Sequence, residues 1–333
     1  MCWKVVYCRV GFHCGFYCHP MNFVETVTHT PFILAEGAVI ERLRRDPNAD
    51  LDPDVLHAGW IYDDVKRGKL EAIYRTYLDI GRNYNVPMIV FTPTWRANLE
   101  RLQAVGFTNG STVNQDCVRF MSEIRDDFGT YREKIFIGGL MGPRGDAYDP
   151  ADAMKTEEAY SFHRWQVGKL VGAGVDFLGA ATLPALSEAM GLAQAMADTG
   201  LPYMLSFVLL ENGTLLDGTP LHQAIAQIDA AVNPKPIGYM INCVHPANLT
   251  IALRHETAQT PEIIERILGL QGNTSRKRPE ELDGAEELDV EKPEVFAEEM
   301  IKLHKEFGLK ILGGCCGTDE RHIRLVSIIA FTR

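Results

Sequence analysis

The sequence predicts an α/β protein built as a single (β/α)8 barrel of the TIM type. Short apolar runs alternate with amphipathic helical stretches, and eight such pairs fit into about 300 residues, as in this fold. Most of the apolar runs are nearly continuous, which is typical of strands covered on both faces. A doubly wound open sheet is the alternative. No G-x-G-x-x-G follows the first strand, which disfavours a dinucleotide-binding version of that sheet.

The expected elements alternate along the whole chain. Strands are expected at 32–37, 87–92, 134–140, 175–180, 203–209, 236–242, 266–270 and 309–313. Helices are expected at 68–83, 96–105, 113–128, 156–172, 186–199, 220–232, 246–258 and 293–306. Several strands end in polar or glycine-rich segments, and active sites of such barrels lie at the C-terminal ends of the strands.

The composition limits the classes of function. The chain of 333 residues has a formal net charge of −11, so it offers no broad basic surface to nucleic acid or to an anionic membrane. It has no apolar run of about 18 residues that would span a membrane, and no clear secretory signal. Its eight cysteines are too few for a disulfide scaffold. We therefore expect a cytoplasmic protein with free or metal-bound thiols.

Two adjacent cysteines, Cys315 and Cys316, lie among glycines in ILGGCCG at 311–317. A third thiol, Cys243, follows another strand in INCVHP at 241–246. Because the strand ends of a barrel meet at one mouth, the three thiols are expected to converge. Neighbouring side chains on a strand point to opposite faces, so the glycines must let the backbone leave strand geometry if both are to face one ion.

Three convergent thiols suit zinc. A catalytic zinc keeps three protein ligands and one open position, and a further thiol bound there would lose its proton. Since the thiolate is the nucleophilic form, alkyl transfer to sulfur is the natural reaction. His245 or His322 would instead close a four-ligand site. Without a metal, the same cysteines would be small buried residues, two in a tight turn and Cys243 in the core.

The two cysteine segments, INCVHP and LGGCCGT, resemble the zinc-cysteine motifs of the homocysteine S-methyltransferase family. MGPRG at 141–145, AGVDFLGAATLPALSEA at 173–189 and LPYMLSFVLLENGTLLDGTPL at 201–221 resemble other segments of that family in the same order. The similarity extends over about residues 32–325. It implies a zinc-containing (β/α)8 barrel in which Cys243, Cys315 and Cys316 hold the metal and act in catalysis through it.

Two departures from the family alter the part of the site that would hold the substrate. The first strand of the family usually ends in an aspartate-glycine turn that is followed by a further glycine and a threonine. In EGAVIERL at 36–43, Glu36 and Gly37 match this turn conservatively, but Ile40 and Glu41 replace the later glycine and threonine. After the fourth strand the family commonly has a glutamate that helps to hold the amino group of the substrate. Ala181 stands at that position, before Thr182, and alanine cannot make a charge-assisted contact with an ammonium ion.

Five residues are expected to bind substrate: Glu36, Gly37, Thr94, Thr182 and Asn242. Glu36 would orient an amine or a metal ligand, or cap the following turn. Thr94 corresponds to a family threonine, although TPTW at 92–95 is also typical of a plain turn. Asn242 would support the adjacent zinc cysteine. Trp95 would favour a cationic methyl donor, or simply pack in its loop.

We expect a barrel domain over 32–333 and an N-terminal extension at 1–31 with no counterpart in the family. Four cysteines crowd into this extension: Cys2, Cys8, Cys14 and Cys18. A second metal site remains open for them, as does a disordered or artefactual extension with Met21 as the start. The charged segment at 276–294 is expected to be a long surface loop, and a role as a lid is open.

The sequence therefore predicts a zinc-dependent S-methyltransferase that forms methionine from homocysteine. The methyl donor would be a small molecule of the S-methylmethionine, S-adenosylmethionine or betaine type. The alternative, which Ala181 favours, is a divergent zinc barrel that acts on another thiol or binds a thiol metabolite without catalysis. A metal-dependent hydrolase fits less well, because no H-x-H follows the first strand. The donor is not specified by the sequence, and a homo-oligomer is left open.

Overall fold

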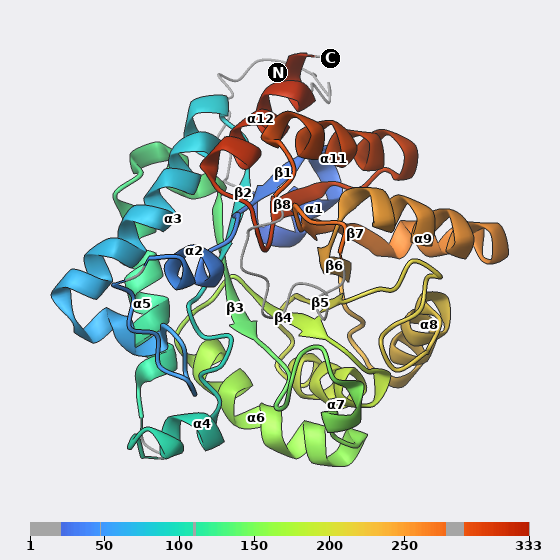
Figure 1. The fold of residues 1–333 in the computed structure, drawn as a ribbon. Helices are drawn as coiled ribbons and strands as arrows, with labels where there is room; N and C mark the ends of the chain where they lie inside the picture. Colours follow the sequence, from blue (N-terminus) through green and yellow to red (C-terminus); the bar gives the residue numbers. More distant parts are fainter. Residues whose placement is uncertain (1–20, 47, 109–110, 278–289, 333) are drawn as a thin grey trace, which may run out of the picture.

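The computed structural model describes residues 21–46, 48–108, 111–277 and 290–332 (Figure 1). Eight parallel strands form one closed barrel, in which each strand pairs with the next along the chain and β8 pairs with β1. The strands are β1 (Ile33–Ala35), β2 (Met88–Phe91), β3 (Ile135–Met141), β4 (Phe177–Leu183), β5 (Tyr203–Phe207), β6 (Gly238–Val244), β7 (Ile267–Gly272) and β8 (Ile311–Gly314). The predicted (β/α)8 barrel is confirmed, and the open-sheet alternative is wrong because Ile33 pairs with Ile311.

Helices surround the barrel (Figure 1). They are α1 (Phe23–His29), α2 (Ile40–Arg44), α3 (Asp64–Tyr84), α4 (Leu99–Ala104), α5 (Val113–Asp126), α6 (Thr156–Gly172), α7 (Leu186–Ala197), α8 (Leu221–Ala231), α9 (Pro246–Gln259), α11 (Pro293–Phe307) and α12 (Glu320–Thr332). Each of the eight expected helices is present, whereas α1, α2 and α12 were not expected. None of the helices in the described ranges is long and apolar enough to cross a membrane.

The core has two layers, which explains why the strands are apolar along their whole length. Alternate strand residues such as Ile33 and Phe177 fill the inside of the barrel. Their neighbours, such as Leu34 and Leu178, pack outward against the helices. Burial on both faces selects continuous apolar runs rather than alternating ones.

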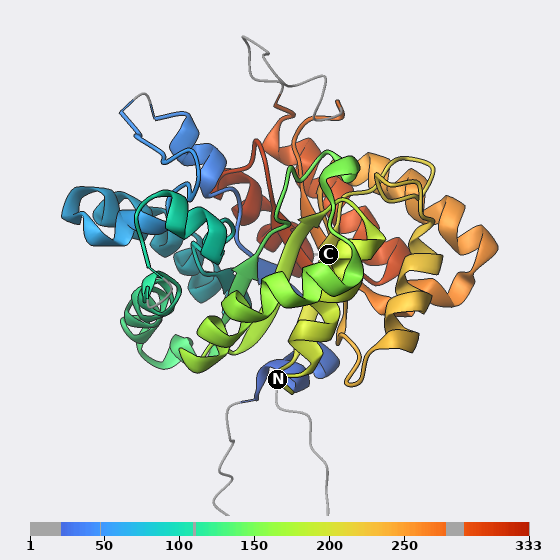
Figure 2. The ribbon, with the colours of Figure 1, turned by 90° about the horizontal axis from the view of Figure 1, so that it is seen from below.

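Helix α1 closes one end of the barrel (Figure 2). It begins with a capping box, in which Asn22 and Glu25 each accept a hydrogen bond from the other's backbone amide. The ring of Phe23 stacks on Phe177 inside the barrel with a centroid distance of 4.0 Å. Lys310 donates from Nζ to the carbonyl oxygen of Val27 at 3.0 Å. The helix is thus packed and hydrogen-bonded as a plug for the end of the barrel opposite α2.

Replacing Phe23 with alanine should remove this plug. Phenylalanine-to-alanine changes in a core cost about 3 to 5 kcal/mol, so we expect a loss of that order in the free energy of unfolding measured with urea. Val24→Ala on the exposed face of the same helix serves as the control and should change it by less than about 0.5 kcal/mol. An equal effect of both changes would show that α1 adds nothing to the barrel.

Two segments singled out in the sequence lie largely outside the described residues. The four cysteines of the N-terminal segment fall within 1–20, so a second metal site there stays a hypothesis. Most of the charged segment 276–294, between β7 and α11, is likewise outside the described ranges. The lid role stays a hypothesis as well.

Candidate active site

A cavity of about 1310 Å³ opens at the C-terminal ends of the strands. Residues at the ends of β1, β2, β3, β4, β6, β7 and β8, or in the loops that follow them, line it. Barrels of this type place their catalytic groups at this face. Glu36, Gly37, Thr182 and Asn242 lie in its wall together with the three cysteines, whereas Thr94 does not.

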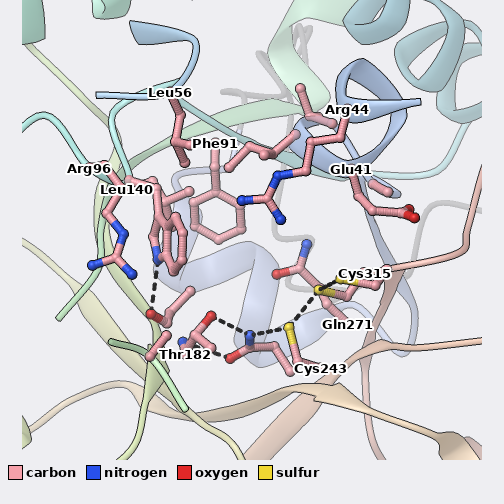
Figure 3. A pocket seen from close by; sticks show the side chains of 18 of the residues that line it. Glu41, Arg44, Leu56, Phe91, Arg96, Leu140, Thr182, Cys243, Gln271 and Cys315 are labelled. Carbon is pink, nitrogen blue, oxygen red and sulfur yellow. Dashed lines mark hydrogen bonds between the residues drawn. The ribbon is translucent and has the colours of Figure 1, made fainter. Parts of the chain in front are cut away.

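The three thiols converge in the wall of the cavity, and Figure 3 shows two of them, Cys243 and Cys315, next to each other. The Sγ atoms of Cys243, Cys315 and Cys316 all lie within 4.8 Å of one another. Cys243 and Cys315 are 2.7 Å apart, and Cys315 and Cys316 are 4.0 Å apart. All three are free cysteines. Residues 72 positions apart in the sequence therefore form one sulfur cluster.

The backbone leaves strand geometry at both ends of this cluster. Cys243 has a left-handed φ of 58°, and the register of β6 against β7 shifts between Asn242 and Val244. This bulge lets consecutive side chains, Asn242 and Cys243, both reach the cavity. At the other end β8 stops at Gly314, and Gly317 turns the chain with a φ of 84° against Thr274. The turn between these glycines lets Cys315 and Cys316 share one side.

The three thiols shift the pKa values of one another. The pKa of Cys243 is lowered well below its ordinary value because the Cys315 and Cys316 side chains hydrogen-bond to its sulfur, against the opposing effect of burial. The contacts with Cys243 and Cys316 raise the pKa of Cys315. The contact with Cys243 and burial raise the pKa of Cys316 to about 12, against a lowering effect of Cys315. A cluster of this kind readily exchanges its protons for a thiophilic cation, since metal-bound thiols are deprotonated.

The sulfur donors fit zinc, which takes cysteine ligands in a tetrahedral arrangement. His245 and His322 do not join the cluster. His245 instead bonds from Nε2 to Glu291 at 2.8 Å and accepts at Nδ1 from the amide of Ala247, which begins α9. His322 bonds through Nδ1 to Asp319 at 3.0 Å. Among the described residues no fourth protein ligand stands beside the three sulfurs, which leaves one coordination position for a substrate atom.

Asn242 joins three strands behind the cysteine cluster. Its Oδ1 accepts hydrogen bonds from the amide of Thr182 at 2.9 Å and from Oγ of Ser206 at 2.6 Å. Its Nδ2 donates to Oγ1 of Thr182 at 2.8 Å and to Sγ of Cys243 at 3.2 Å. Thr182, like Cys243, has a left-handed φ, of 64°. Left-handed backbone is costly for residues other than glycine, and Asn242 contacts both residues that adopt it here.

The two threonines expected to bind substrate are both engaged by the protein. The hydroxyl of Thr182 accepts from Asn242, so its position in the wall is set by that contact. Thr94 is fully buried, and its hydroxyl donates to the carbonyl oxygen of Leu140 at 2.7 Å. Thr92, two residues earlier, lines the cavity instead and shares a 2.7 Å hydrogen bond with Thr94.

Glu36 lies in the wall of the cavity and is buried. Its Oε2 accepts from the amide of Phe91 at 3.0 Å, and its carbonyl oxygen accepts from the amide of Gly314 at 3.0 Å. Burial raises the pKa of Glu36 to about 8, against the lowering effect of the Phe91 amide. The next residue, Gly37, lies so close to Tyr77 that a Cβ would come within 2.7 Å of its hydroxyl. Glycine is thus required where β1 meets α3.

The raised pKa of Glu36 predicts a pH-dependent stability. The folded state holds the Glu36 proton more tightly than the unfolded state, so stability is highest below the ordinary pKa of 4.5 and falls as pH rises toward about 8. We expect Glu36→Gln to remove roughly 2 to 4 kcal/mol of this fall, measured by urea unfolding at pH 5 and pH 8. If Glu36→Gln unfolds with the same pH dependence as the original protein, Glu36 is not a buried acid.

Trp95 forms another part of the wall. Its Nε1 donates to the carbonyl oxygen of Ala181 at 3.1 Å, and the guanidinium of Arg96 stacks over its ring at 4.2 Å from the centroid. Ala181 itself lines the cavity with a methyl group where a carboxylate was expected in the family. The side of the cavity formed by β4 therefore offers no negative charge to a substrate amine.

The cavity residues that were not among the expected site residues include Arg44, His57 and Tyr148. Tyr148, in the loop after β3, lies close enough to Cys243 to help lower the pKa of that thiol. The same burial and nearby thiols raise the pKa of Tyr148 itself. No local pattern marks these residues, because each comes from an irregular segment or the end of a short helix.

A closed parallel barrel with converging cysteines at the mouth is the architecture of a barrel enzyme with a sulfur-lined site. A sequence model of the family described as homocysteine S-methyltransferase matches residues 33–329. The chain therefore belongs to the homocysteine S-methyltransferase family and is an S-methyltransferase. The resemblance noted from the cysteine segments is thereby confirmed.

Individual relatives are distant but cover nearly the whole chain. Homocysteine S-methyltransferase YbgG of Bacillus subtilis is 23% identical over 92% of this chain and 97% of its own. Betaine-homocysteine S-methyltransferase of Drosophila melanogaster is 25% identical over 86% of this chain and 90% of its own. The metallated form of the Escherichia coli homocysteine methyltransferase MmuM superposes with a TM-score of 0.72, at 21% identity, over 91% of this chain and 98% of that chain. This last likeness supports the barrel fold.

Proposed function

We propose that this protein transfers a methyl group from a small-molecule donor to the thiol of homocysteine, giving methionine, with Zn²⁺ held by Cys243, Cys315 and Cys316. The observation that carries the proposal is the convergence of three Sγ atoms within 4.8 Å in the wall of the cavity. Membership of the family and the homocysteine S-methyltransferases among its relatives support homocysteine as the acceptor. Free thiols in this site also favour a reducing compartment such as the cytoplasm.

The ion would lower the pKa of the acceptor thiol, so that its sulfur reacts as a thiolate. The protein positions the acceptor thiol. The cysteine cluster sets where the acceptor sulfur lies, and Asn242 holds Cys243 in place through its contact with Sγ. In the transfer, a new carbon–sulfur bond forms on the acceptor while the bond between the methyl carbon and the donor breaks. Holding both partners in one cavity supplies much of the rate.

The nature of the donor is inferred from the walls of the cavity. The rings of Phe91 and Trp95 both line it. Aromatic faces attract cations, and the methyl groups of sulfonium and quaternary ammonium compounds are carried by cationic centres. We infer a donor of the S-methylmethionine, S-adenosylmethionine or betaine type, which the name of the Drosophila relative also supports for betaine.

The test is a measurement of zinc together with a screen of methyl transfer. Protein purified under reducing conditions is analysed for metal, then mixed with homocysteine and each of the three donors while methionine is quantified. We expect about one zinc per chain and transfer from at least one donor. Protein without zinc that still transfers the methyl group would contradict the role of the cysteines, and zinc-loaded protein without transfer from any donor would contradict the reaction.

A second candidate is a zinc barrel that acts on another thiol, or binds one without transfer. Ala181 favours it, because the β4 side of the cavity lacks the carboxylate that would hold the amino group of homocysteine. Including thiols other than homocysteine in the screen separates the candidates. Transfer to another thiol alone would support a changed acceptor, and binding without transfer would support a sensor.

A further inference from the structure

Arg44 is a solvent-exposed cation of the candidate active site that has no partner among the described residues. It is the last residue of α2, and its side chain points into the cavity (Figure 3). Within the described part of the chain, its guanidinium forms no hydrogen bond or ion pair. Two nearby arginines do: Arg42 on α2 pairs with Glu320, and Arg45, directly after α2, pairs with Glu41. A planar guanidinium with all its donors available matches the geometry of a carboxylate.

His57 lines the same cavity, and one of its ring nitrogens, Nδ1, has no hydrogen-bond partner among the described residues. It is 3% exposed, and its Nδ1 is buried with no hydrogen bond in the described residues. Burial, with a further effect of the positive charge of Arg44, lowers the pKa of His57 to about 3. The imidazole is therefore neutral, and a buried ring nitrogen left without a partner is unfavourable unless a ligand satisfies it. Its tautomer with a proton on Nδ1 would donate to an anion.

Among the described residues that line the cavity, neither Glu41 nor Glu36 forms an ion pair with Arg44. Glu41 is occupied by Arg45 and by the amide of Gly317. Glu36 carries little negative charge at neutral pH, because burial raises its pKa to about 8. Arg44 and the three cysteines line one and the same cavity, as Figure 3 shows for Arg44, Cys243 and Cys315. One small molecule can thus meet the sulfur cluster at one end and Arg44 at the other.

We propose that Arg44, with His57 beside it, binds the anionic group of the acceptor thiol. The inference rests on the proposed function and names the substrate class of the site: small thiols that carry a carboxylate. The wall formed by β4 determines how the amino group of the acceptor is held. Because Ala181 replaces the carboxylate that would contact an amino group, an acceptor without the amino group should be held almost as well as homocysteine.

The test compares three acceptors on zinc-loaded protein by isothermal titration calorimetry. Homocysteine carries both groups, 4-mercaptobutyrate lacks the amino group, and 3-aminopropanethiol lacks the carboxylate. Hydrogen bonds to charged groups correspond to roughly 10-fold to 100-fold in affinity, so we expect a loss of that size for 3-aminopropanethiol and less than about 3-fold for 4-mercaptobutyrate. Binding is read without any methyl donor, so the result does not depend on transfer.

The variant Arg44→Gln should weaken both carboxylate-bearing thiols by roughly 10-fold to 100-fold and leave 3-aminopropanethiol within about 2-fold. Arg44→Lys should restore part of the loss. Arg254→Gln is the matched control, because it removes one positive charge from an exposed ion pair with Glu306, outside the cavity lining. Thermal unfolding of each variant checks the fold.

Three outcomes would overturn the inference. They are unchanged binding of homocysteine by Arg44→Gln, an effect of Arg44→Gln on the methyl donor alone, and no binding of any thiol. Carboxylate-dependent thiol binding without methyl transfer would support the inference while it contradicts the proposed reaction. The two proposals therefore fail separately.

Discussion

Replacing Cys315 with alanine is expected to abolish both zinc binding and methyl transfer. Cys315 lies between the other two sulfurs, at 2.7 Å from Cys243 and 4.0 Å from Cys316. Loss of residues that merely support metal ligands costs about 10-fold to 100-fold in affinity, so loss of a ligand itself should cost more, on the order of a thousandfold. Metal analysis after dialysis should find less than about 0.1 zinc per chain, and turnover should fall in parallel.

Cys117→Ala is a matched control for Cys315→Ala. The Cys117 thiol is fully buried but lies in α5, where its Sγ contacts the carbonyl oxygen of Ala58 at 3.5 Å. Cys117→Ala should lower the free energy of unfolding by about 1 kcal/mol and leave the zinc content unchanged. If Cys315→Ala retained full zinc, the three-sulfur site would be wrong.

The second large effect is expected for Asn242→Ala. This change removes four hydrogen bonds and leaves the buried amide of Thr182 without its acceptor. We expect a loss of about 2 to 4 kcal/mol in the free energy of unfolding. The affinity for zinc should fall about 10-fold to 100-fold, because the strained backbone at Cys243 loses its support.

Asn248→Ala is the comparison for this prediction. Asn248 is an asparagine on α9 whose amide makes one hydrogen bond, to the carbonyl oxygen of Arg276, near the surface. Its replacement should change stability by less than about 1 kcal/mol and should not affect zinc affinity. An Asn242→Ala protein with normal zinc affinity and normal stability would show that the hydrogen bonds behind the cluster are dispensable.

Much of the architecture follows from the pattern of the chain. The eight strands were predictable because burial on both faces makes each one a continuous apolar run. Eight βα units favoured a barrel over an open sheet, and the pairing of β8 with β1 decided between them. The three cysteines were predictable because strand ends meet at one mouth. Helix α1 was not expected, although Asn22 followed by Glu25 is the signature of a capping box that marks its start.

The finer parts of the site depend on geometry that no local pattern encodes. The left-handed backbone of Cys243 and Thr182 is unusual for these residue types, so it could not be predicted from the sequence. Thr92 rather than Thr94 faces the cavity, because a turn of two residues decides which hydroxyl points inward. Arg44 and His57 come from the long connection between β1 and α3, and only the tertiary fold brings them to the sulfur cluster.

The position of the cysteines also determines when the site can appear during folding. Cys243 follows β6, while Cys315 and Cys316 follow β8, the strand that closes the barrel against β1. Contacts between segments so far apart in sequence are expected to form late, because other interactions must first offset the entropy cost of closing the long loop between them. An ion held by these cysteines would therefore not guide the collapse of the chain. We expect it to bind a barrel that is already closed, so a chelator should remove it without unfolding the protein.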